Sequence, residues 1–447
     1  MSRTRISPSR AGASAGLRLG ERVRQLRVAA GLTQSELAGD RCSKEYVSQI
    51  ERGKTRPPRE TIEWIAARLG VDPDFLAHGV SADQRGRVEA ALARGEALTE
   101  ANREFEAVAQ FEDMRSAVLA TGLPELEVRS LNGEAYARLR LGEVREALEL
   151  LGRSRSLAEG PGFSDVERAD VLFRIGVCRY RLSSIQTALG LLNEALALAE
   201  GSGFPCDQLR ASILHWRSRC YRRQRDLQAA REDVERALEL AEGLEDARTM
   251  ADLSFQASLV ADREGHWVLA RTYAERAKSY YEELADRTNV SRLLNNLGGL
   301  NFLLGHPEQA IAILKDAFGV ALEVGNNAEA AQAVGSLAQV HLRTGDPVLA
   351  EEQAKHALTL LDGREDYLNE IGMSQLVVGR AAMEQGRLED AGDWFDAADA
   401  TFERFESISH RAACWVAKGD LAARRGEDHA AALLYRRAAE ALQDVRF

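Results

Sequence analysis

The sequence predicts an all-α protein in which a small N-terminal helical domain precedes an α-solenoid of about nine helical hairpins. First, Ala, Leu, Glu and Arg dominate the 447 residues and there are nine prolines, which is a helix-forming composition. Second, small residues recur about every 40 residues from residue 80 onward, whereas residues 17–79 interrupt this period. We therefore expect a flexible basic arm at 1–16, a compact domain at 17–79 and a repeat array at 80–447.

The distribution of charge separates the same two parts. Residues 1–79 hold 14 Lys and Arg against 9 Asp and Glu, whereas residues 80–447 hold 44 against 60, a net charge of −16. A polyanion would be attracted to the front of the chain and repelled by the rest. The arm carries Arg3, Arg5 and Arg10, for which two interpretations stay open: a solvated tail, or insertion into a DNA minor groove.

Several protein classes do not fit this sequence. No long uncharged apolar run predicts a membrane span, and the N-terminus lacks the apolar stretch of a secretory signal. The five scattered cysteines indicate reduced thiols of a cytoplasmic protein. The stretch "RGKT" at 52–55 resembles half of a phosphate-binding loop, but Ser48 stands where the first glycine belongs. With no catalytic constellation evident, we expect no enzyme, no cofactor, no metal and no catalytic residue.

The repeat array has a fixed register of small residues. Nine repeats share a central alanine, at Ala107, Ala147, Ala188, Ala230, Ala270, Ala310, Ala350, Ala391 and Ala431. Another small residue lies twelve positions earlier, and alanine recurs seven positions later in seven of the nine repeats. Five positions before the central alanine stands Gly in six repeats and Asn102 in a seventh. Such a residue ends a helix in the left-handed conformation, and small residues let helices approach closely, so each repeat predicts a helical hairpin.

This small–turn–small–small register resembles the tetratricopeptide repeat, although that family's usual unit has about 34 residues. The resemblance implies roughly 18 helices stacked into a right-handed superhelix with a concave groove.

The compact domain shows clear helix starts. Thr33 precedes "QSELA" and has Glu36 at the capping-box position. Ser43 begins a second short helix, from Lys44 to about Arg52, with Val47 and Ile50 facing inward. The stretches "LGERVRQLRVAAGLTQSELA" and "VSQIERGKTRPPRETIEWIAARLGVDPDFL" resemble the Cro/phage-repressor, or xenobiotic-response-element, type of helix-turn-helix domain. That resemblance implies five helices, with Ser43–Arg52 as the recognition helix in the major groove.

The resemblance also assigns the DNA contacts. Base edges are expected to meet Lys44, Glu45 and Gln49, whose side chains suit guanine, cytosine and adenine respectively. Phosphates are expected to meet Gln34, Ser43, Tyr46, Lys54, Arg56 and Arg59.

Two structural features of this domain follow from the resemblance. Arg27 and Glu51 are expected to form a partly buried ion pair. The turn "AGDRC" between Ala38 and Ser43 is one residue shorter than is common, and we expect Gly39 and Asp40 to form it.

The array offers one pattern for ligand binding. Arginine stands five positions after the first small residue in six repeats, which we name the arginine series: Arg140, Arg181, Arg223, Arg263, Arg343 and Arg424. Two interpretations stay open. The series could receive carboxylates or carbonyl oxygens of a peptide, or it could complement helix dipoles. The predicted ligand groove comprises Tyr180, Arg181, His215, Arg219, Arg222, Arg223, Arg263 and Asn295.

The architecture resembles the peptide-pheromone receptors of bacterial quorum sensing. The resemblance implies a cytoplasmic transcriptional regulator that binds double-stranded operator DNA, and so lies at the nucleoid when bound. The array would sense a peptide or protein signal, the protein would be a homodimer, and no membrane would be involved. An alternative is a tetratricopeptide adaptor that binds a protein partner, with DNA binding secondary.

Overall fold

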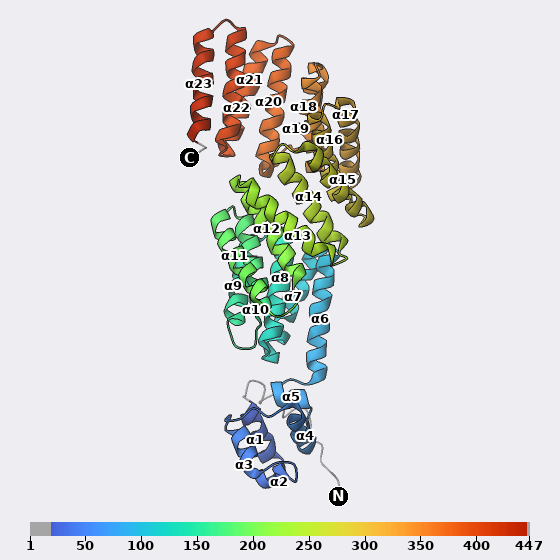
Figure 1. The fold of residues 1–447 in the computed structure, drawn as a ribbon, viewed down its shortest axis with the longest axis vertical. Coiled ribbons are helices and arrows are strands. Elements are labelled where there is room, and N and C mark those ends of the chain that lie inside the picture. Colours follow the sequence, from blue (N-terminus) through green and yellow to red (C-terminus); the bar gives the residue numbers. More distant parts are fainter. Residues whose placement is uncertain (1–18, 445–447) are drawn as a thin grey trace. The chain divides into compact units, whose positions relative to one another are not determined.

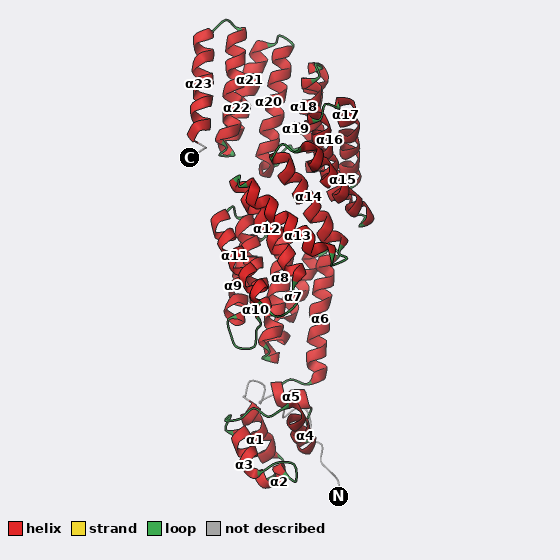
Figure 2. Ribbon diagram, in the orientation of Figure 1, coloured by secondary structure: helices red, strands yellow, loops and turns green. Residues whose placement is uncertain are grey.

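The computed structural model describes residues 19–444, and every regular element in that range is helical (Figure 2). The chain divides into two compact units, Met1–Cys220 and Tyr221–Phe447. The basic arm expected at residues 1–16 lies outside the described residues. The expectation of an all-α fold is confirmed.

The first unit begins with the five expected helices (Figure 1). They are α1 (Leu19–Ala29), α2 (Gln34–Ala38), α3 (Lys44–Glu51), α4 (Arg59–Leu69) and α5 (Pro73–His78). Their shared core includes Val23, Leu37, Val47, Ile50 and Leu76, each at most 1% exposed. The predicted capping box is present, because Glu36 N donates to Thr33 Oγ1 over 3.2 Å and Thr33 N donates to Glu36 Oε2 over 2.7 Å.

Paired helices fill the rest of the first unit. Its antiparallel pairs are α6 (Ala82–Glu100) with α7 (Glu104–Thr121), α8 (Pro124–Leu141) with α9 (Val144–Ala158), and α10 (Asp165–Arg181) with α11 (Ile185–Gly201). The boundary between the units falls within α12 (Asp207–Gln224).

The second unit continues the series of hairpins. After α13 (Leu227–Glu242) come α14 (Ala247–Arg263), α15 (Trp267–Glu283), α16 (Arg287–Leu303), α17 (Pro307–Glu323), α18 (Asn327–Arg343) and α19 (Pro347–Leu360). A short 3-10 helix, η2 (Glu365–Tyr367), precedes α20 (Leu368–Glu384), α21 (Leu388–Arg404), α22 (Ile408–Arg424) and α23 (Asp428–Asp444). Within residues 82–444 the eighteen helices match the number that the repeat register predicts. The superhelical hand and the groove remain predictions.

The small residues occupy the interfaces between helices. The central alanines are 0% exposed in the first eight repeats, and Ala431 is 3% exposed. At the first small position, a Cβ on Gly298 would lie 2.4 Å from Leu314 Cγ, and one on Gly379 would lie 2.6 Å from Phe395 Cδ1. Because a Cβ at either glycine would clash with the facing helix, glycine at these two positions is a packing requirement of the hairpin.

The turn inside each hairpin takes a left-handed conformation. The six glycines at this position have φ between 77° and 87°, and Asn102 has φ of 57°. Ser183 and Arg225 hold the same position in the two remaining repeats and have φ of 60° and 64°. The sequence signal therefore identified seven of these nine turns and missed the two that lack Gly or Asn.

Candidate DNA interface and ligand site

Helix α3 presents a polar face beside a buried one. Ser43 caps its start, because Ser43 Oγ accepts from Tyr46 N over 3.1 Å. Val47 and Ile50 are 0% and 1% exposed, whereas the side chains expected to contact bases, Lys44, Glu45 and Gln49, are exposed. The three residues therefore lie together on the solvent side of one rigid helix.

The end of α3 is held by the expected ion pair. Arg27 Nε lies 2.6 Å from Glu51 Oε1, and the two side chains are 13% and 4% exposed. Burial by itself would raise the pKa of the Glu51 carboxyl, but hydrogen bonds from Arg27 and Gln34 outweigh it and hold this pKa below its usual range. Arg27 Nη1 also donates to Leu32 O over 2.8 Å, so one guanidinium joins α1, the loop before α2, and α3.

The residues expected to contact phosphates fall into two groups. Ser43, Lys54, Arg56 and Arg59 are exposed, and Arg59 Nε donates to Glu63 Oε1 over 2.9 Å. Gln34 and Tyr46 have structural contacts instead. Gln34 Nε2 donates to Glu51 Oε2 over 2.8 Å, and Tyr46 packs partly buried against the domain core. All six phosphate contacts remain predictions.

The short turn before α3 is braced from α4. Gly39 has φ of 48°, in the half of backbone space that favours glycine. Arg68 Nη2 donates to Glu36 O over 2.6 Å, and its guanidinium lies 5.3 Å from the centre of the Trp64 ring. A Cβ at Gly39 would lie 2.9 Å from Arg68 Nη1. Arg68 was not recognised from the sequence, because 32 positions separate it from Glu36.

A second arginine joins the first helix to the last one of the domain. Arg22 is 5% exposed and donates from Nε to Leu76 O over 3.0 Å, and its Nη2 donates to Ala77 O. Burial lowers the pKa of Arg22. The guanidinium satisfies carbonyl groups at the end of α5 that have no intrahelical donor, which fixes that helix on α1.

Two members of the arginine series bind the repeat before their own. Arg140 Nη1 donates to Thr99 O over 3.2 Å, and Arg424 Nη1 donates to Met383 O over 3.0 Å. Both carbonyls lie in the last turn of a helix, so these two contacts fit the helix-dipole interpretation. Arg343 lies against an aromatic side chain, with its guanidinium 5.8 Å from the centre of the Phe302 ring.

The predicted ligand residues of the first unit gather around one tryptophan. The Arg219 guanidinium lies 4.3 Å from the centre of the Trp216 ring and 5.2 Å from the centre of the Tyr180 ring. The Arg181 guanidinium and the His215 ring lie 5.9 Å and 6.0 Å from the Trp216 ring centre. Trp216 was not among the predicted ligand residues, although its place between two of them, His215 and Arg219, was a usable signal.

The remaining predicted ligand residues belong to the second unit. Arg222 and Arg223 end α12, Arg263 ends α14, and Asn295 lies in α16. Asn295 Oδ1 is buried and has no hydrogen-bond partner among the described residues.

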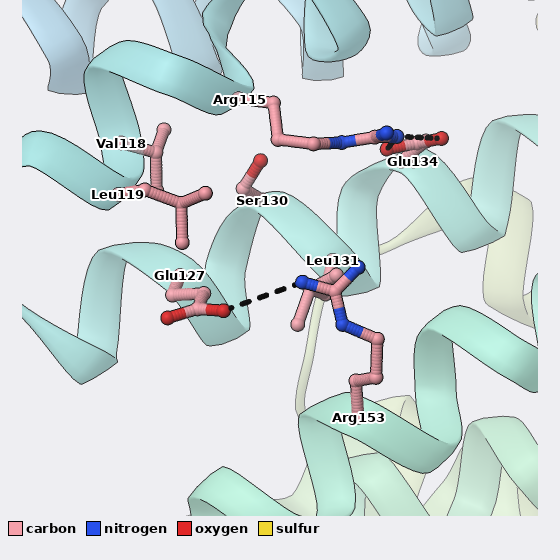
Figure 3. A pocket seen from close by; sticks show the side chains of 8 residues that line it. All are labelled: Arg115, Val118, Leu119, Glu127, Ser130, Leu131, Glu134 and Arg153. Carbon is pink, nitrogen blue, oxygen red and sulfur yellow. Dashed lines mark hydrogen bonds and ion pairs between the residues drawn. The ribbon is translucent and has the colours of Figure 1, made fainter.

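A separate shallow hollow lies between α7, α8 and α9 (Figure 3). Its charged side chains neutralise each other, because Arg115 Nη2 lies 2.9 Å from Glu134 Oε2 and Arg153 Nη2 lies 3.5 Å from Glu127 Oε1 (Figure 3). The hollow therefore holds no free charge to attract a ligand.

Two kinds of feature are absent from the described residues. Residues 19–444 contain no group of three or more His, Cys, Asp or Glu side chains arranged to hold a metal ion. Among the helices described, none is long and apolar enough to cross a membrane.

Family models match both parts of the chain. A model described as "Helix-turn-helix domain" matches residues 18–79. Three models described as "Tetratricopeptide repeat" match residues 132–203, 211–243 and 289–362.

Known proteins resemble the two parts separately. "HTH-type transcriptional regulator DdrOP3" of Deinococcus deserti is 38% identical over 65 residues, which cover 14% of this chain. The chain spans about half the length of this curated relative (50%). A crystal structure of a Rap protein complexed with Competence and Sporulation Factor has a TM-score of 0.60 and 16% identity, covering 81% of this chain and 99% of that one. A STAND protein with a tetratricopeptide repeat sensor, PH0952 from Pyrococcus horikoshii, has a TM-score of 0.56 and 11% identity, covering 98% and 73%. At these identities the two structures show a shared fold.

Proposed function

The chain joins an N-terminal helix-turn-helix DNA-binding domain to an array of tetratricopeptide repeats, and from this architecture we propose a sequence-specific transcriptional regulator. In this proposal α3 enters the major groove of operator DNA, and the array responds to a peptide or protein signal. The protein acts in the bacterial cytoplasm, at the nucleoid when bound.

The DNA-binding part of the proposal is supported by the way in which α3 is anchored and exposed. Its inner face is buried, its end is clamped by Arg27 and Glu51, and its outer face presents Lys44, Glu45 and Gln49 to solvent. Lys donates to guanine O6 and N7, Glu accepts from cytosine N4, and Gln bonds adenine N6 and N7. A helix held at both ends presents these groups at one angle, which is what direct base recognition requires.

The proposal of signal sensing is based on the array. Its fold is that of the Rap protein whose structure contains Competence and Sporulation Factor. The aromatic and arginine cluster around Trp216 offers chemistry for a peptide. We further propose a homodimer, because one such domain contacts few base pairs and dimers bind two half-sites about one helical turn apart. A molar mass of two chains plus one operator duplex, by light scattering of the complex, is the expected result.

Selection of DNA from a random pool tests the DNA-binding proposal. The full chain should enrich one sequence family, and Lys44→Ala or Gln49→Ala should each lose about 1–3 kcal/mol of discrimination between that sequence and its base-substituted forms. Fluorescence anisotropy at fixed salt measures this difference. Arg343→Ala, a charge loss in the array, serves as the control and should leave discrimination unchanged. Unaltered discrimination in both α3 variants would show that these side chains do not contact bases.

One observation favours the adaptor alternative. At the start of α15, Trp267, Val268 and Leu269 are 39%, 61% and 42% exposed, a run of apolar side chains suited to a protein partner. The two functions predict different outcomes when a strain lacking this gene is complemented with the double variant Lys44→Ala with Gln49→Ala. If the protein is a regulator, the double variant fails to restore control of the target genes. If it is an adaptor, the double variant restores the wild-type phenotype.

A further inference from the structure

We infer that Arg219, which lies against the Tyr180 and Trp216 rings, receives a carboxylate group of the peptide signal. The inference rests on the proposed sensing function and specifies the chemistry of the ligand. The site lies wholly in the first unit, between the last turn of α10 and the second half of α12.

Two aromatic rings hold the guanidinium of Arg219. Its Cζ lies 4.3 Å from the Trp216 ring centre and 5.2 Å from the Tyr180 ring centre, and the two rings meet edge to face at 77° with their centres 5.3 Å apart. Cation–π contact engages the flat faces of a guanidinium. The N–H groups point outward in the plane of the guanidinium, in the fork that matches both oxygens of a carboxylate.

No acceptor among the described residues matches the N–H groups of Arg219. Among the described residues Arg219 makes no hydrogen bond and no ion pair, and its Nε is buried from solvent. Two other arginines of α12, by contrast, have partners within the protein. Arg210 Nη1 lies 3.1 Å from Asp207 Oδ1, and Arg217 Nη1 donates to Asn193 Oδ1 over 3.0 Å. A buried donor without an acceptor is costly, so this orphaned Nε–H beside two aromatic rings points to an acceptor that arrives with a ligand.

The charge of α12 favours an anion. This helix carries Arg210, Arg217, Arg219, Arg222 and Arg223 against Asp207 as its one acidic residue, whereas residues 80–447 have a net charge of −16. A cationic element in an acidic array concentrates an anionic group at one place. A free C-terminus and an Asp or Glu side chain carry the same carboxylate, so the experiment separates these two sources.

Three pools of random synthetic hexapeptides test the inference with the full chain. The first pool has free C-termini and no Asp or Glu, the second has amidated C-termini with Asp and Glu, and the third has amidated C-termini and no carboxylate. Peptides retained by the protein are identified by affinity selection and mass spectrometry. The first or second pool should be retained, which names the source of the carboxylate, and the third should not.

Variants of α12 supply the second comparison. Arg219→Gln should weaken binding of the retained peptides roughly 10- to 100-fold, because it removes a charged bidentate contact. Arg219→Lys, which keeps the charge and loses the fork, should recover part of the loss. Arg217→Gln removes the same charge two positions away and should bind as the wild type does. Unfolding temperatures verify that each variant is folded. The comparison of peptide pools uses the wild-type protein, so it does not depend on the folding of any variant.

Two results would overturn the inference, and they are distinguishable. If the third pool is retained as well as the others, or if Arg219→Gln binds like the wild type, then carboxylate recognition is wrong while peptide sensing stands. If the wild type retains no peptide from any pool, then both the inference and the proposed peptide sensing fail.

Discussion

At the scale of single residues, Gly20 decides how closely α1 approaches the end of α3. A Cβ at this position would lie 2.3 Å from Ile50 O and 2.7 Å from Glu51 O, both backbone atoms that cannot turn away. Gly20→Ala should therefore push α3 outward and cost about 1–3 kcal/mol. Hydrogen exchange measured by mass spectrometry should show faster exchange in α3.

Gly86 provides the matched control for this substitution. It lies in α6 with nothing within 4 Å of an added Cβ. Gly86→Ala should stabilise α6 by about 0.5–1 kcal/mol, because alanine loses less backbone entropy in a helix. Unchanged protection of α3 in Gly20→Ala would mean that α1 tolerates a wider spacing from it.

Glu51 makes the DNA-binding domain sensitive to acid. Hydrogen bonds from Arg27 and Gln34 hold its folded pKa below the unfolded value of about 4.3. The stabilisation is therefore complete above about pH 4.3 and is lost as the pH falls through the folded pKa. Glu51→Gln should cost about 2 kcal/mol at pH 7 and progressively less below about pH 4.

Unfolding temperatures of wild type and Glu51→Gln between pH 3 and 7 measure this difference. Glu60→Gln is the control, because the Glu60 side chain is 85% exposed and lies 3.9 Å from Arg41, so its removal should change little. A constant difference between wild type and Glu51→Gln across the range would contradict the assignment.

At the scale of elements, the turns inside the hairpins differ in backbone strain. Arg225 holds φ of 64° at the position where Gly265, in the next repeat, holds φ of 79°. A left-handed conformation costs a residue with a side chain roughly 1 kcal/mol. Arg225→Gly should therefore stabilise the turn between α12 and α13 by about that amount, as measured by urea unfolding.

The reverse substitution, from glycine to arginine in the next repeat, is the control. Gly265→Arg places a side chain on the same backbone conformation and should destabilise its turn by roughly 1 kcal/mol. Equal stability of wild type and both variants would indicate that these turns relax to another conformation when the residue changes.

At the scale of the whole molecule, charge separates the basic helix-turn-helix domain from the acidic repeat array. Residues 80–447 have a net charge of −16, so they should release no counterions from DNA. The salt dependence of operator affinity should then come from exposed cations such as Lys54 and Arg56. Replacing both with Ala should reduce the slope of log K against log salt by about 1.8, or about 0.9 for each.

The same titration on an array variant is the control. Arg343→Ala should leave the slope unchanged, because Arg343 lies in α18 of the array. A slope that falls equally in this variant would place DNA phosphates against the repeats.

The sequence was sufficient for the features that depend on local chemistry. The capping box at Thr33, the cap at Ser43 and the hairpin turns depend on residues close in sequence or on a residue's own backbone freedom. The small-residue register also predicts hairpin packing, since only small residues fit between crossing helices. The turns at Ser183 and Arg225 were not predicted, because the fold imposes a left-handed conformation on residues that do not favour it.

What only the tertiary structure decided is which polar groups meet. Gln34 lies 17 positions from Glu51, Arg68 lies 32 from Glu36, and Arg140 lies 41 from Thr99. The sequence by itself determined where helices begin, end and repeat, because backbone preferences and side-chain size act over short stretches. The partners of each guanidinium and amide, including the two rings around Arg219, depend on how helices distant in sequence pack, which no local pattern contains.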